Sequence, residues 1–309
     1  MKFAFKLIAA SLALAAAGQA SATIADQTTA GNVGGAEMFL AVWDSAAQKS
    51  YVRDLGIHFN DFLPAANLGV TSGLASKLDK STDGAIISTQ SAPTAGTLAF
   101  GAAPAVAAGS VLASGYTLNF AADPLLASFL GTGGSLSTSL QWMVGSYDGT
   151  SNGVVNGQRL LTTSNGAVAI SNTSLGTVSA GSSGYITSNN GIATMGAGNA
   201  ANGSATAVKA DGGAYFDAAG LPMATWGGKT SFNTLATVGT SQKFWYLGVS
   251  SSNGPDQAIV NQFTGASWNL DTAGNLTYTV AAVPEADTWA MFAAGLLAVG
   301  AIARRRLQS

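Results

Sequence analysis

Apolar and polar residues alternate over short stretches along much of this 309-residue chain, with the period of two that is typical of β-strands. Aromatic and β-branched residues concentrate in these stretches, and clusters of Gly, Asn, Asp and Ser separate them. The pattern predicts strands over residues 37–44, 51–59, 115–120, 139–148, 214–217 and 243–250.

The clearest pair of strands closes the patterned region. Residues 266–270 and 275–280 both alternate, and the turn sequence Asp-Thr-Ala-Gly over 271–274 joins them. This arrangement predicts a β-hairpin. By contrast, the Gly- and Ser-rich zone from about 149 to 213 has the weakest pattern, and we expect long loops or a flexible edge there.

One internal helix is predicted, over residues 123–130. Asp123 suits the N-cap and Pro124 the first helical position. Many short strands, glycine-rich turns and a single helix together predict an all-β fold, a single β-sandwich of the jelly-roll type. No linker and no fixed-period repeat divides residues 23–282, so we expect one domain there.

The first 22 residues have the order of a secretory signal peptide. Lys2 and Lys6 supply positive charge, a nearly continuous apolar run covers 7–17, and Ala20 and Ala22 place small residues at the two positions that signal peptidase reads. The predicted cut follows Ala22. The chain is therefore expected to be exported.

The other end of the chain is typical of a membrane stop. Residues 288–303 carry no charge, and at about 1.5 Å per residue such a helix spans roughly 24 Å of the ~30 Å hydrocarbon layer. Arg304, Arg305 and Arg306 follow at once, and their side chains can extend to the lipid headgroups. Since positive charge stays on the cytoplasmic side, the rest of the chain is predicted to lie outside.

A short extended segment, Val283-Pro284-Glu285, stands directly before this predicted transmembrane helix, because proline fixes its own φ and disfavours helix in the residue before it. The order of V-P-E, spacer, apolar helix and arginine cluster resembles the PEP-CTERM sorting signal of Gram-negative bacteria. The resemblance covers residues 283–309, and Ala286 stands where the family has its second proline. A plain single-span anchor is the alternative.

The resemblance implies a partner and a fate. Val283, Pro284 and Glu285 would be recognised by exosortase, a membrane-embedded transpeptidase-like enzyme, and residues 304–306 would be the membrane stop. The chain would cross the inner membrane, stay anchored in it transiently, and then reach the cell surface or the extracellular space. Such tails are typical of bacteria that make exopolysaccharide. A structural role in a biofilm matrix is therefore implied, with exopolysaccharide as a further partner.

The composition agrees with an exported body. There is no cysteine, so neither disulfides nor thiolate metal sites contribute to the fold. Two of the fifteen acidic and five of the thirteen basic residues lie in the two end segments, which leaves a net charge of −5 over residues 23–282. Basic patches interleaved with aromatics are missing, so nucleic-acid binding is not expected.

Catalytic signals are sparse. His58 is the only histidine, and we expect it to be a partly exposed strand residue. Glu37 is the only glutamate between residues 23 and 282, and the scattered acids suggest no pair for glycoside hydrolysis. Residues 149–153 match the G-x-S-x-G pattern of a nucleophile elbow, but that motif needs a helix after it, which Gly157 would interrupt.

Metal and cofactor sites are not predicted either. Asp148, Thr150 and Asn152 copy the first half of a calcium loop, but Arg159 takes the place of the bidentate carboxylate. A looser loop site built from Asp148 and backbone carbonyls is the alternative. The Gly-Ala-Gly sequence at 196–198 lacks the strand and the acidic partner of a dinucleotide site. We therefore predict no catalytic residue, metal or cofactor, and a protein that is not an enzyme.

Two other functional classes stay open. A secreted hydrolase would need His58 or a carboxylate pair inside a pocket. A carbohydrate-binding module or adhesin would stack sugar rings on exposed aromatic side chains, although burial in the core is the expected role for most tryptophans. The candidates for stacking are Trp142, Trp226, Trp245 and Trp268.

Overall fold

The structure is a computed structural model, and it describes residues 23–25, 36–62, 97–98, 115–127, 129, 134–148, 159–166, 168, 170–195, 203–217, 233–248, 258–282 and 295–297. Four predicted features lie outside these residues: the signal peptide, the Val283-Pro284-Glu285 motif, the arginines at 304–306 and Trp226.

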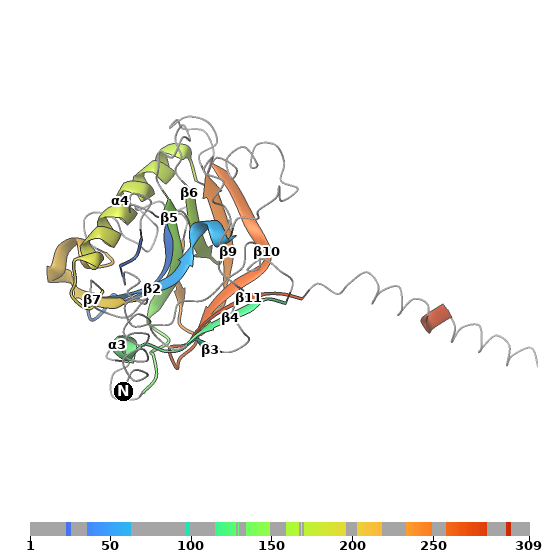
Figure 1. Cartoon of the computed structure of the whole chain (residues 1–309), viewed down its shortest axis with the longest axis horizontal. Coiled ribbons are helices and arrows are strands. Elements are labelled where there is room, and N and C mark those ends of the chain that lie inside the picture. The colour runs from blue at the N-terminus through green and yellow to red at the C-terminus, as the bar shows by residue number, and fades with distance from the viewer. Residues whose placement is uncertain are drawn as a thin grey trace, which may run out of the picture.

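The described part of the fold is mostly β and is built on one large curled sheet of eleven strands (Figure 1). The strands lie in the order β3-β4-β11-β10-β9-β6-β5-β1-β2-β7, and β8 pairs with β5. Only the β3–β4 pair is parallel among the described strands. Their bounds are β1 Glu37–Asp44, β2 Lys49–His58, β3 Thr97–Leu98, β4 Thr117–Phe120, β5 Gln141–Asp148, β6 Arg159–Ser164, β7 Ser204–Val208, β8 Ala236–Thr237, β9 Gln242–Gly248, β10 Ile259–Leu270 and β11 Leu276–Val280.

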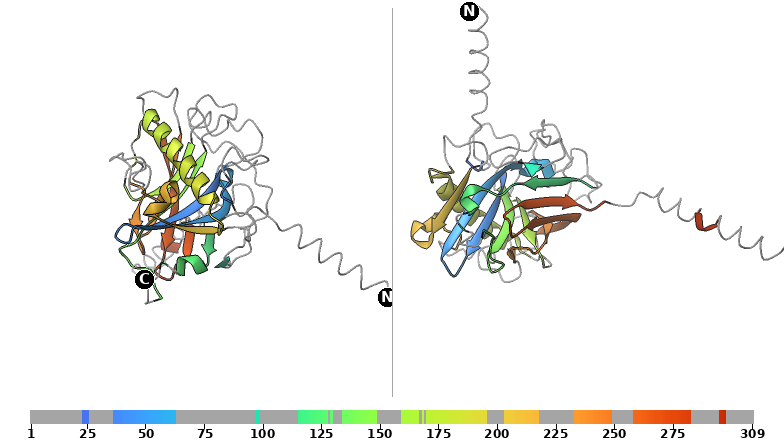
Figure 2. Two further views of the ribbon diagram at one scale, coloured as in Figure 1. Left: turned by 90° about the vertical axis from the view of Figure 1, so that its left-hand side faces the viewer. Right: turned by 90° about the horizontal axis from the view of Figure 1, so that it is seen from below.

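The curl of the sheet encloses the larger of two hydrophobic cores. This first core takes buried side chains from β1 and β2 near one end of the strand order and from β4, β10 and β11 near the other end. Strands so far apart in the order can share one core only if the sheet bends round it. Figure 2 shows the two ends from further sides, with α4 (Asn172–Asn190) and β7 grouped away from β4, β10 and β11.

Aromatic side chains fill the centre of the first core. Phe62, at the end of the 3₁₀ helix η1 (Phe59–Phe62), lies 5.0 Å from Phe244 and 5.5 Å from Tyr278 between ring centroids. Trp268 lies 4.8 Å from Tyr278. Such pairs add about 0.5–1.5 kcal/mol each beyond the burial of their area. Through Phe62 the cluster anchors the end of β2 to β9, β10 and β11.

A second core lies on the opposite face of the same strands. Alternate residues of β1 point to the two faces, because side chains alternate along a strand: Leu40 and Val42 belong to the first core, and Phe39 and Ala41 to the second. The helix α4 covers the second core with Leu175, Val178, Tyr185 and Ile186.

The expectation of long loops or a flexible edge between 149 and 213 is wrong for the described residues of this zone, because they include α4, β6 and β7. The helix is rich in Ser, Gly, Thr and Asn, which are poor helix formers. Its buried face includes Ser182 and Asn189, so the apolar period is interrupted in the sequence. Ser182 donates a hydrogen bond to Val178 O (3.0 Å). Packing on the sheet therefore decides that this segment is helical.

Several strand predictions are confirmed. The segments 37–44, 51–59, 115–120, 139–148 and 243–250 overlap β1, β2, β4, β5 and β9.

The closing hairpin is also confirmed. It pairs Leu270 with Leu276 across its turn. In that turn Asn275 N–H donates to Asp271 Oδ1 (2.8 Å), and Gly274 takes the positive φ of 85° that favours glycine.

The predicted strand over 214–217 is wrong. Ala214 ends the 3₁₀ helix η4 (Lys209–Ala214), and the residues that follow form a turn. Their aromatic side chains are placed for burial and not for strand pairing: Phe216 lies in the second core, 5.7 Å from Tyr185.

The finer prediction of a two-sheet jelly roll stays a prediction, since the described strands form one continuous sheet. Along the described chain, no helix has both the length and the apolar character needed to cross a membrane. Of the predicted transmembrane helix at 288–303, only 295–297 are described, as a helical turn in which Leu296 and Leu297 are exposed.

The predicted helix at 123–130 is confirmed in shortened form as α3 (Pro124–Ala127). Asp123 caps it by accepting a hydrogen bond from Leu125 N–H at Oδ1 (2.9 Å). The other oxygen, Oδ2, accepts a 2.6 Å hydrogen bond from the buried Tyr51 hydroxyl. Burial and the Asp123 carboxylate raise the pKa of Tyr51 well above 10.0, so the hydroxyl stays protonated and donates.

We expect Tyr51→Phe to lower the free energy of unfolding by about 1–3 kcal/mol, because a buried carboxylate oxygen loses its donor. The matched control is Tyr185→Phe: this hydroxyl is also buried, but it has no hydrogen-bond partner among the described residues. Its removal should change stability by less than about 0.5 kcal/mol, or stabilise. Urea unfolding of both variants measures the difference, and equal losses would contradict it.

Candidate functional site: a carboxylate and histidine cluster beside residues 23–25

An irregular hairpin brings an acid and the only histidine together. Phe39 pairs with Asp54 in the regular β1–β2 register, which by itself would place Glu37 opposite Gly56. The register shifts at this point, and Glu37 pairs with His58 instead. Gly56 takes a positive φ of 61°, which favours glycine. Its N–H donates to Asp54 Oδ1 (2.8 Å), so that Asp54 and Gly56 together form a β-bulge.

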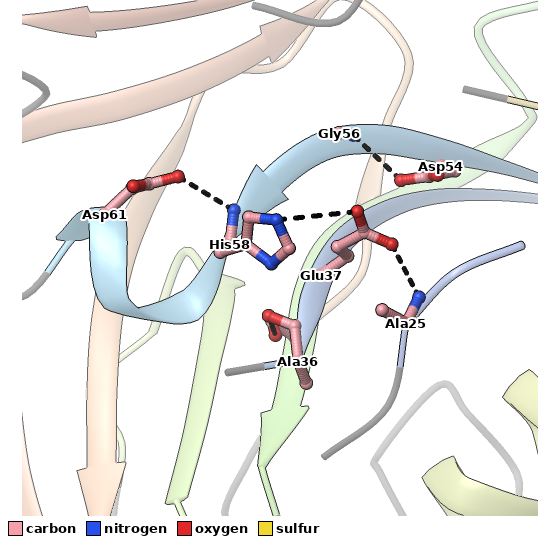
Figure 3. A network of polar contacts seen from close by, with 8 residues as sticks. Ala25, Ala36, Glu37, Asp54, Gly56, His58 and Asp61 are labelled. Atoms are coloured by element: carbon pink, nitrogen blue, oxygen red, sulfur yellow. Dashed lines mark hydrogen bonds and ion pairs between the residues drawn. The ribbon is translucent and has the colours of Figure 1, made fainter. Parts of the chain in front are cut away.

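The cluster formed by this bulge consists of Glu37, Asp54, His58 and Asp61 (Figure 3). Glu37 Oε1 lies 3.7 Å from His58 Nε2. The main-chain N–H of His58 donates to Asp61 Oδ2 (3.0 Å) in η1. The side chain of His58 is 24% exposed and that of Glu37 13% exposed, whereas Asp54 and Asp61 are buried. The cluster therefore reaches solvent at His58, the partly exposed strand residue that the sequence predicts.

The N-terminal residues 23–25 lie against the same cluster. Ala25 N–H donates to Glu37 Oε2 (2.5 Å), and Glu37 N–H donates to Ala25 O (2.8 Å). In Figure 3 this segment runs beside the start of β1, with Ala25 facing the carboxylate of Glu37. One oxygen of Glu37 thus faces histidine, and the other holds the main chain of residues 23–25.

Burial shifts the pKa values of the Glu37 and Asp54 carboxylates. It raises the pKa of Glu37 above 4.5, although the charge of His58 and the Ala25 hydrogen bond act in the opposite direction. Burial also raises the pKa of Asp54 well above 3.8, and the neighbouring Glu37 charge adds to the increase. Both groups therefore hold their protons more tightly in the folded chain than in the unfolded chain.

A carboxylate beside histidine is chemically able to transfer protons. However, the hydrogen bonds of Glu37, Asp54 and Asp61 given above all go to main-chain N–H groups, which is the pattern of carboxylates that fix the backbone. In the described parts of the chain, no group of three or more His, Cys, Asp or Glu side chains could hold a metal ion. The arrangement supports a positioning role better than a catalytic one.

Two of the four tryptophan candidates for sugar stacking are excluded. Trp142 and Trp268 are fully buried in the first core. Trp245 is half-buried, and its Nε1–H donates to Ser164 O (3.1 Å). No aromatic side chain of the described residues is exposed. The predicted core role is therefore confirmed for Trp142 and Trp268.

The other motifs do not form sites in the described residues. The G-x-S-x-G sequence at 149–153 lies outside them; β5 comes before it, and a strand, β6, begins at Arg159. Arg159 pairs with Asp148 across the β5–β6 ladder, so the position that would need a calcium-binding carboxylate holds a strand arginine. The Gly-Ala-Gly sequence at 196–198 lies outside the described residues.

A pocket of about 310 Å³ opens elsewhere on the body, between β2, β7 and η4. Its lining combines a half-buried aromatic ring with charged and polar groups: Lys49, Phe129, Thr206, Ala207, Val208 and Asp211. Sequence reasoning missed it because Phe129 lies far along the chain from β2 and β7.

No protein-family model matches the chain, and comparison with curated proteins and with solved structures finds no match either. Function must therefore be inferred from the residues and their arrangement.

The raised pKa values predict how stability depends on pH. As pH rises from the ordinary carboxylate range through the raised pKa values of Asp54 and Glu37, the unfolded chain loses these protons first. The free energy of unfolding should therefore fall over this window, since the folded chain binds more protons.

Asp54→Asn should stabilise the protein at pH 8 by about 1 kcal/mol, because a neutral amide replaces a buried charge while its oxygen can still accept from Gly56 N–H. At pH 4 the effect should be smaller. Asp217→Asn, at an exposed site, is the matched control and should change little at either pH. Chemical unfolding at several pH values checks this, and a larger loss of stability at pH 8 than at pH 4 would contradict it.

Proposed function

We propose that this chain is an exported structural protein of the cell surface or extracellular matrix, processed by exosortase at its C-terminal tail. Residues 1–22 direct export across the inner membrane of a Gram-negative bacterium. Residues 288–303 then hold the chain in that membrane until the motif Val283-Pro284-Glu285 is processed. The body of the protein, residues 23–282, remains as the functional part, and it acts by architecture and not by catalysis.

The single observation that carries this proposal is the order of features in the last 27 residues. The C-terminal end of the described sheet supports it. The last strand, β11, ends at Val280, and Ala281 N–H makes a further hydrogen bond to Gly265 O (2.9 Å) just ahead of the motif. The predicted motif therefore follows directly after the last described strand of the sheet.

The interior of the body supports a non-enzymatic role. The carboxylates of Glu37, Asp54 and Asp61 accept hydrogen bonds from main-chain N–H groups, which is a positioning role. A jelly-roll arrangement belongs to the same proposal, since a sheet that curls round one core brings two arms face to face. A polar, sparsely charged β-body of this kind suits a hydrated polymer matrix.

Carbohydrate binding is a second candidate, and the pocket beside β7 favours it. The ring of Phe129 can pack against the C–H face of a sugar, while Lys49, Thr206 and Asp211 offer donors and acceptors to its hydroxyls. The rings of Phe129 and Tyr51 form an edge-to-face pair, with ring centroids 6.2 Å apart. We expect any polysaccharide affinity of the purified protein on a glycan array to be lost with Phe129→Ala. The affinity should be retained in the Trp245→Phe variant, because Trp245 does not line the pocket.

The main proposal is tested on the tail. We expect Glu285→Ala to prevent processing, so that the chain keeps its full C-terminal mass in its native host. Asp287→Ala removes the same charge two residues further on and serves as control. Mass spectrometry of the mature protein should find an end between Pro284 and Asp287 in the wild type. An intact Ser309 in the wild type would overturn processing and leave a simple membrane anchor.

A further inference from the structure

The main chain of Ile24 and Ala25 is bound like a peptide ligand. Ile24 N–H donates to Asn190 Oδ1 (3.0 Å), and Asn190 Nδ2 donates back to Ile24 O (2.9 Å). Glu37 engages both main-chain groups of Ala25 in the same way, through its carboxylate and its own N–H. Two consecutive residues thus have every main-chain polar group satisfied, each by a single partner residue.

The side chain of Ile24 supplies the selective contact. It is only 1% exposed and belongs to the second core, together with residues of β1 and α4. Main-chain hydrogen bonds of this kind hold any extended peptide, whereas a pocket for one side chain selects the sequence. The site therefore suits an extended segment of three residues whose central residue is aliphatic.

The partner residues stand on elements that are fixed by contacts of their own. Asn190 is the last residue of α4, and its neighbour Asn189 fixes the helix end by donating to Tyr185 O (2.9 Å) and Ala214 O (3.2 Å). Glu37 is fixed by the β1–β2 register and lies near His58. A rigid site loses little conformational entropy when it binds, which favours affinity.

We propose that Glu37, Asn190 and the second core form a peptide-binding site, and that the chain fills it with its own Thr23-Ile24-Ala25. The timing of this docking rests on the proposed function. Cleavage after Ala22 makes Ile24 the second residue of the mature chain, so a cut only three residues further on would remove the ligand. The position of the cut is thus matched to what the second core needs.

The first experiment changes the ligand within the full-length chain. Ile24→Asp should lower the Tm by roughly 5–10 °C, since a buried aliphatic side chain is lost from a body of this size. Ile24→Val, the matched control, keeps a branched apolar side chain and should lower it far less. Asn190→Ala should lower the Tm by several degrees, and Asn165→Ala, at an exposed asparagine, should not. Equal Tm values for Ile24→Asp and Ile24→Val would overturn the site.

The second experiment supplies the ligand separately. The synthetic peptide Thr-Ile-Ala-Asp-Gln should raise the Tm of the Ile24→Asp variant in proportion to the logarithm of its concentration once above the Kd. The peptide Thr-Asp-Ala-Asp-Gln should have no effect. If the first peptide does not raise the Tm at millimolar concentration, residues 23–25 are only a part of the fold, and the proposed peptide-binding site is overturned.

These experiments use purified protein, so they do not depend on export or exosortase. N-terminal sequencing of the native protein tests the link to maturation. A mature chain that begins at Thr23 supports this link. A mature chain that begins after Ala25 would show that residues 23–25 are not the ligand of the site. The proposal of C-terminal processing does not depend on this result.

Discussion

Strand β1 has no face directed to solvent, and the rest of the structure depends on this constraint. Its residues from Met38 to Val42 are all buried, with alternate side chains in the two cores. Each core then needs a cover of its own. The first core is covered by the curl of the sheet, which brings β4, β10 and β11 round to face β1 and β2.

The second core is covered by less regular means. The helix α4 contributes its buried face although its composition disfavours a helix, and Ile24 closes part of the remaining surface. Helices of this kind owe their stability to tertiary contacts more than to propensity. The cover is thus assembled from segments that have weak preferences of their own, which explains why their main-chain groups are held by Asn189, Asn190 and Glu37.

Charge has a limited and local part in this protein. Buried carboxylates are expensive unless their oxygens accept hydrogen bonds, and here Glu37, Asp54 and Asp61 each accept one from a main-chain N–H. They set the bulge, the start of η1 and the position of residues 23–25. The observed hydrogen bonds of these carboxylates position the main chain. An architectural role is therefore what we propose for the body, and the proposal rests on the pattern of the tail.

The sequence by itself determined the elements whose signal is local. Alternation defined β1, β2, β5 and β9, an Asp-to-Gly turn defined the closing hairpin, and Asp123 with Pro124 marked α3. The pattern behind the proposed sorting tail is also local.

Only the tertiary structure decided the features that depend on packing between distant segments. These features are α4, the single curled sheet, the contact of Glu37 with His58, and the docking of Ile24. A regular hairpin would have paired Glu37 with Gly56, and the bulge that moves it to His58 is formed by one glycine conformation and one aspartate hydrogen bond. Such contacts leave no period in the sequence, because their energy comes from burial and from partners remote along the chain.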